Sequence, residues 1–163
     1  MDPSKCSRPS EEIEAALNSL DLSRIRFKLV HPGEGYDWSE EKAVRVERYY
    51  KRFLFLTVTS DEPIVPTEEI DTFWHAHILD TRKYHTDCQQ VFGFYLHHFP
   101  YFGLRGEQDA ANLAYAFART KCLYQERYGE PYAEMTAIGS DCSDVSCQAC
   151  GWKDISSTAT LQA

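Results

Sequence analysis

Apolar side chains recur every three or four residues along much of the chain, which is the spacing of one helix face. The first such stretch follows Ser10 and the second follows Ser39. Each serine precedes two glutamates, and a hydroxyl cap with acidic residues in the first turn marks the start of a helix. The two apolar faces consist of Ile13, Ala16, Leu17 and Leu20, and of Ala43, Val46, Tyr50 and Phe53.

Two further helices are expected in the second half of the chain. One spans roughly residues 68–92, between the cap Thr67 and Gly93, and the other spans about residues 107–128 and stops at Gly129. Residues 21–39 contain Pro32-Gly33-Glu34-Gly35 and are expected to form a short extended piece and a turn. The pattern predicts a mostly-α, single-domain bundle of about four helices in residues 10–135. A cysteine-containing, partly flexible tail is expected in residues 136–163.

Composition narrows the class of protein. The chain has 163 residues, 43 % of them hydrophobic, which is enough for one domain with a packed core. The net charge of −8 argues against nucleic acid and anionic membranes as partners. Apolar runs are only a few residues long, too short to span a bilayer. The N-terminus does not read as a secretory signal, so we expect a cytoplasmic protein whose six cysteines are thiols or metal ligands.

Histidines are concentrated in one region. Four of the six lie between residues 75 and 97, and His98 follows at once. On a continuous helix His75 and His77 point about 200° apart, so they cannot serve one site. His77 falls on the apolar face and is the inward histidine. Three roles are open for His77. It is a core histidine that is hydrogen-bonded to Asp80 or to a backbone carbonyl, or it is a metal ligand, or it is an acid–base group.

Helix geometry also limits which groups can meet His77. Cys88 shares its face but lies eleven residues further on, roughly 16 Å along a continuous axis, so the two cannot bind one ion. His98 reaches back to His77 only if the chain folds back at Gly93. His77 and His98 are therefore the predicted ligands in the helical region.

The tail contains a second candidate metal site. Cys142, Cys147 and Cys150 have the spacing Cys-x4-Cys-x2-Cys, which places three thiols within reach of one tetrahedral ion. A histidine or a further cysteine would complete the shell. The cysteines either form this second site or complete the helical histidine site by folding back onto it. The alternatives are a flexible tail with incidental or redox-active thiols, or a copper(I) site.

The segment around these histidines resembles a known family. It contains Phe73-Trp74-His75-Ala76-His77-Ile78-Leu79-Asp80-Thr81, then Tyr84, Asp87-Cys88 and His97-His98. This is similar to the glycine-rich domain-containing protein-like family, and the chain looks like a short, bacterial-type member without the glycine-rich region. The resemblance implies a helical protein and transfers no reaction. The motif positions that it carries over are Trp74, His75, His77, Leu79, Tyr84 and His98.

These observations give one leading hypothesis and two rivals. The leading hypothesis is a metal-binding helical protein, with zinc favoured and His77, His98, Cys142, Cys147 and Cys150 as ligands. The first rival is a metal-free module in which the aromatic segment of residues 99–102 binds a protein partner. The second is a non-haem iron or copper enzyme that uses His77, His98 and Asp80. Whether the protein is an enzyme stays open: the sequence contains no glycine-rich phosphate loop, no Gly-x-Ser-x-Gly and no His-Glu-x-x-His.

Overall fold

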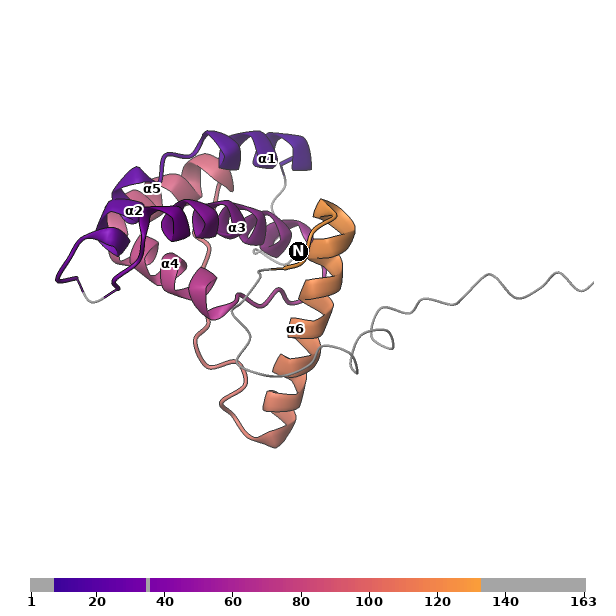
Figure 1. Ribbon diagram of the computed structural model, residues 1–163. Coiled ribbons are helices and arrows are strands. Elements are labelled where there is room, and N and C mark those ends of the chain that lie inside the picture. The colour runs from indigo at the N-terminus through magenta and orange to yellow at the C-terminus, as the bar shows by residue number, and fades with distance from the viewer. Residues whose placement is uncertain (1–7, 35, 133–163) are drawn as a thin grey trace, which may run out of the picture.

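A computed structural model describes residues 8–34 and 36–132, and every regular element in them is an α-helix. The mostly-α class is therefore confirmed. The expected count of about four helices is wrong, because this part of the chain contains six (Figure 1). They are α1 (Ser10–Ser19), α2 (Ser23–Val30), α3 (Glu40–Thr59), α4 (Glu68–Leu79), α5 (Thr81–Val91) and α6 (Glu107–Tyr128).

One additional helix lies where an extended piece was expected. α2 buries Ile25 and Leu29, and Leu22 just before it is also buried. These three positions follow helical spacing. The Pro32-Gly33 turn comes after the helix has ended at Val30, so the turn residues end α2 rather than replace it.

The other additional helix arises because the expected helix over residues 68–92 is interrupted at Asp80. Asp80 has φ −81° and ψ 70°, outside the helical region, and its carboxylate accepts a hydrogen bond from the Lys83 backbone N–H at 3.3 Å. It therefore ends α4 and caps α5. This break changes the direction of the chain, so that Trp74 and His77 of α4 contact Tyr84 and Asp87 of α5.

Helix α3 occupies the centre of the molecule (Figure 1). It contacts α1, α2 and α4, and α5 lies against α1 and α4. Tyr50 and Phe53 of α3 are fully buried at the middle of the core. The expected caps at Ser39 and Thr67 are present, since Ser39 accepts from Lys42 N–H at 3.1 Å and Thr67 from Ile70 N–H at 3.3 Å. The expected cap at Ser10 is wrong, because Ser10 is the first residue of α1, Pro9 precedes it, and no side chain caps this helix.

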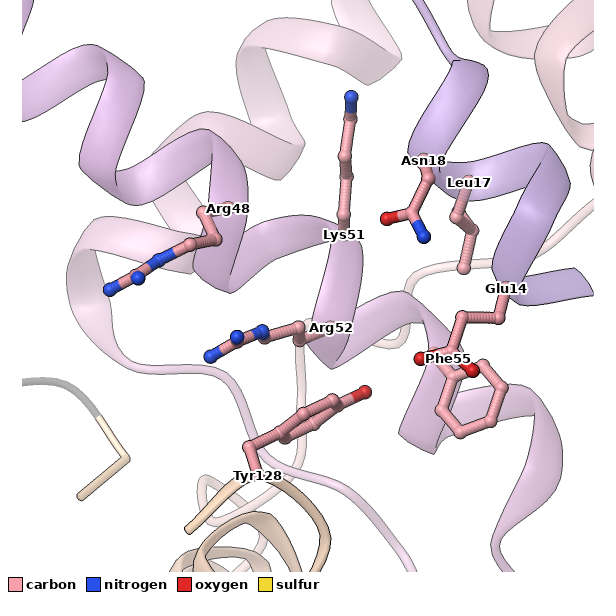
Figure 2. Close-up of a pocket in the computed structure, with 8 residues that line it drawn as sticks. All are labelled: Glu14, Leu17, Asn18, Arg48, Lys51, Arg52, Phe55 and Tyr128. Carbon is pink, nitrogen blue, oxygen red and sulfur yellow. The ribbon is translucent and has the colours of Figure 1, made fainter. Parts of the chain in front are cut away.

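Helix α6 runs along one side of the molecule and has the bounds that the sequence predicted (Figure 1). The buried ring of Tyr124 holds its C-terminal half against the core, 5.8 Å from the ring of Tyr49. Gly129 ends the helix with a left-handed φ of 69°. A cavity of about 330 Å³ lies between α1, α3 and the end of α6 (Figure 2).

No helix in residues 8–34 or 36–132 is both long and apolar enough to cross a membrane.

Candidate metal centre

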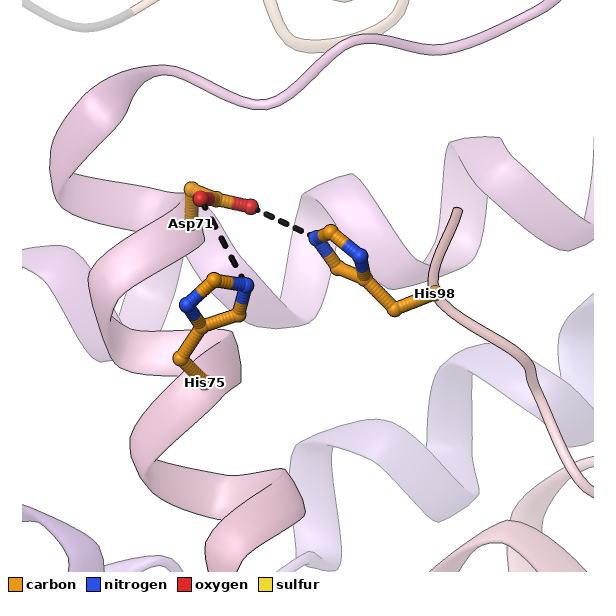
Figure 3. A group of neighbouring side chains, drawn as sticks. All are labelled: Asp71, His75 and His98. Atoms are coloured by element: carbon orange, nitrogen blue, oxygen red, sulfur yellow. Dashed lines mark hydrogen bonds and ion pairs between the residues drawn. The ribbon is translucent and has the colours of Figure 1, made fainter. Parts of the chain in front are cut away.

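Two residues of α4 and one residue after α5 form a compact group of metal-ligating side chains (Figure 3). Asp71 and His75 are four residues apart on α4, so they share one helix face. The Asp71 Oδ1 atom lies 2.9 Å from His98 Nε2, and Asp71 Oδ2 lies 3.7 Å from His75 Nε2. Both imidazole rings thus present Nε2 to a single carboxylate.

The spacing of this group suits a metal ion. One ligand atom from each side chain lies within 4.8 Å of the other two. Tetrahedral zinc with bonds of 2.0–2.1 Å needs its ligand atoms about 3.3 Å apart, so small rotations of the side chains suffice. His75 is 51 % exposed and His98 15 % exposed. One side of the group therefore faces solvent and leaves room for further ligands.

The position of His98 depends on a chain of buried hydrogen bonds. Gly93, at φ 81°, turns the chain back after α5. The Trp74 Nε1–H then donates to the Tyr84 hydroxyl at 2.9 Å, and that hydroxyl donates to the Leu96 carbonyl at 2.5 Å. The His98 ring packs on Trp74 with centroids 4.5 Å apart. The aromatic positions of the sequence motif therefore hold the loop that carries His98.

His77 is buried and separate from this group. It is only 1 % exposed, and both of its ring nitrogens have partners. The Tyr50 hydroxyl lies 2.9 Å from Nδ1, and Asp87 Oδ2 lies 2.9 Å from Nε2. In this structure His77 is therefore a hydrogen-bonded core histidine, and its role as a metal ligand stays a prediction. Its partners are Tyr50 and Asp87, not the expected Asp80 or a backbone carbonyl.

The partners also fix the protonation of this network. An ionised carboxylate only accepts, so the neutral His77 ring carries its proton on Nε2 and Nδ1 accepts from Tyr50. Burial lowers the pKa of His77, and this effect outweighs the opposing attraction of Asp87. Burial also raises the pKa of Tyr50 well above its usual value, which keeps its hydroxyl protonated. The Lys83 ammonium lies 2.8 Å from Asp87 and completes the network.

The structure therefore places the predicted ligands in different surroundings. His98 belongs to the group, His77 does not, and Asp80 caps α5. Cys142, Cys147 and Cys150 lie outside the described residues, so their metal cluster stays a prediction.

Sequence reasoning missed Asp71 and His75. Their i, i+4 spacing is visible in the sequence, but His75 lies on the exposed face of the helix, whereas the ligands were predicted on the apolar face.

The two cysteines within the described residues, Cys88 and Cys122, offer no additional ligand to this group. Cys88 is a buried free thiol, and burial raises its pKa, which disfavours a reactive thiolate. Cys122 is disulfide-bonded, in contrast to the expectation that all six cysteines are thiols or metal ligands.

Comparison with known proteins identifies a family. A family model described as UCP032817-like matches residues 22–127. Because the match covers well over half of the chain, the protein belongs to this family. No curated protein and no solved structure matches. The description names no activity and no glycine-rich domain, so the resemblance to the glycine-rich domain-containing family stays a prediction. The matched segment contains the whole of the Asp71, His75 and His98 group.

Proposed function

We propose that this member of the UCP032817-like family binds one divalent transition-metal ion through Asp71, His75 and His98, with zinc as the favoured ion. The observation that carries the proposal is the convergence of two imidazole nitrogens on one carboxylate. These three residues come from two segments that the fold has to bring together. Imidazole and carboxylate are both established zinc ligands.

The donor set indicates an open rather than a closed site. Three protein ligands on a partly exposed face leave a coordination position for water, whereas structural zinc sites use four protein ligands. Bound zinc would lower the pKa of such a water. In this structure the Asp71 carboxylate faces Nε2 of both imidazoles, a place that the ion would take when bound, and Trp74 holds the His98 ring against α4.

Zinc titration by calorimetry tests the proposal. The protein is the metal-stripped full chain in which Cys142, Cys147 and Cys150 are changed to serine, so that the tail cannot bind the ion. We expect one equivalent of zinc. His98→Ala and His75→Ala should each weaken binding by at least about 100-fold, while His85→Ala, an exposed histidine on α5, leaves binding unchanged.

Two outcomes would contradict this assignment. Equal zinc affinity in the His75, His98 and His85 variants would exclude the group. Binding that is present with the native cysteines and absent in the serine variant would place the ion in the tail. The same titration with iron(II) tests the related proposal of a non-haem iron site, because two histidines and one carboxylate also suit that ion.

The rival proposal of a metal-free interaction module has one observation in its favour. Phe99 and Tyr101 are 57 % and 59 % exposed, and Leu104 is 76 % exposed. Three large apolar side chains thus lie on one short exposed loop. A chain that binds no metal in any form, with its fold intact, would favour this module over the metal site.

A further inference from the structure

The cavity between α1, α3 and α6 has an unusual charge for this protein. Three cations and one acid line it, although the whole chain has a net charge of −8. Its volume of about 330 Å³ lies at the lower end of the range for small-molecule sites. The lining residues are Glu14, Leu17, Asn18, Arg48, Lys51, Arg52, Phe55 and Tyr128.

Two of the cations form a pair. Arg48 and Arg52 are one turn apart on α3, and their side chains extend in the same direction (Figure 2). Both contact the same carboxylate oxygen, Glu130 Oε1: Arg52 through a short ion pair and Arg48 at 3.6 Å. Arg52 is also held over the ring of Tyr128, 4.5 Å from its centroid. The pair is therefore arranged to accept an oxyanion, and Glu130 shows that a carboxylate fits.

The third cation is already engaged. The Lys51 ammonium donates to the Leu20 carbonyl at 2.7 Å and lies 3.0 Å from Glu47. In Figure 2 it extends away from the two arginines. Glu14, the acid in the lining, is paired with Arg127 at 2.8 Å. Arg48 and Arg52 share a single carboxylate, and Arg52 also donates to the Tyr124 hydroxyl at 2.8 Å, so an anion that enters the cavity has only Glu130 to displace from the pair.

We infer that this cavity binds a small organic anion with a phosphate or carboxylate head and an apolar body. The head replaces Glu130 between Arg48 and Arg52, since a planar guanidinium recognises both oxyanions through paired hydrogen bonds. The body lies against the ring of Tyr128, the lining side chain next to Arg52. Glu130 follows Gly129, the left-handed residue that ends α6, and acts as an internal competitor for the site. The inference uses no residue of the metal site.

Titration of the full chain with phenyl phosphate, followed by NMR of the backbone amides, tests this inference. We expect saturable shifts in α1, α3 and the end of α6. Arg48→Gln should weaken binding about tenfold or more, through loss of a charge-assisted hydrogen bond. Glu130→Gln should strengthen it, because the competing carboxylate is removed. A parallel titration with phenylacetate shows whether the head is a phosphate or a carboxylate.

Matched controls separate this site from general charge effects. Arg45→Gln removes a cation of similar exposure from the same helix, where it pairs with Glu69 instead, and should leave binding unchanged. Benzyl alcohol, which has the ring without the charge, should not bind. A dissociation constant weaker than about 1 mM for both anions, or equal affinity in the Arg48, Arg45 and Glu130 variants, would overturn the inference.

Discussion

His77 shows how much the packing of one buried residue can depend on hydrogen bonds. It connects Tyr50 of α3, on one side, to Asp87 of α5, on the other. Three helices therefore meet at one imidazole. Removal of the ring would leave a cavity, the buried Tyr50 hydroxyl without its partner, and Asp87 with Lys83 alone.

We accordingly expect His77→Ala to lower the free energy of unfolding by about 3 kcal/mol, measured by urea denaturation. His75→Ala, at an exposed position on the same helix, should change it by less than about 0.5 kcal/mol. A His77→Ala protein as stable as the His75 variant would contradict the network described here.

The buried position of His77 also predicts that the stability of the fold depends on pH. Because burial lowers the pKa of His77 in the folded protein, the unfolded chain binds the proton first as the pH falls. His77 therefore stabilises the fold above its ordinary pKa of about 6.5, and this stability is lost as the pH falls through the lower, folded pKa. The urea midpoint of the wild-type protein should fall more between about pH 7 and about pH 5 than that of His77→Gln. Equal decreases in both proteins would exclude His77 as the source.

The candidate site was only partly predictable at the scale of residues. His98 could be selected because Gly93 allows the chain to fold back. Its neighbours Asp71 and His75 could not be predicted without the break at Asp80, because a continuous helix would carry α5 and the following loop away from Asp71. The inward direction of His77 followed from periodicity alone, but Asp87 could reach it only after the same break.

At the scale of helices, Asp80 has a double role as the end of α4 and the cap of α5. We expect Asp80→Ala to destabilise the protein by about 1 kcal/mol, through loss of the hydrogen bond to Lys83 N–H. Asp80→Asn keeps a capping oxygen and should cost much less. Thermal unfolding of the two variants makes the comparison, and equal losses of stability would show that the cap is not the cause.

Helices with strong local signals were predicted well. The bounds of α6 follow from its apolar face and from Gly129, and the starts of α3 and α4 follow from their caps at Ser39 and Thr67. The helix predictions were wrong where two sequence signals overlapped. Pro32 and Gly33 obscured the short α2, and an apolar face that continues past Asp80 obscured the break, although aspartate is a favoured cap.

At the scale of the whole molecule, metal binding should be linked to stability. An ion that binds only the folded chain stabilises it by about 2.7 kcal/mol at a concentration 100 times its dissociation constant. For a chain of this size we expect zinc to raise the Tm by roughly 5–10 °C. Magnesium, which prefers all-oxygen sites, should have little effect. Asp71→Asn should abolish the zinc shift, and an equal shift in this variant would place the ion elsewhere.

The most direct test is a crystal of the full chain grown with zinc, with diffraction measured at the zinc absorption edge. The anomalous difference map should show a peak about 2.0–2.2 Å from one oxygen of Asp71 and from Nε2 of His75 and His98. A map with no peak between these three side chains, from a crystal in which zinc is bound elsewhere, would contradict the proposed metal site.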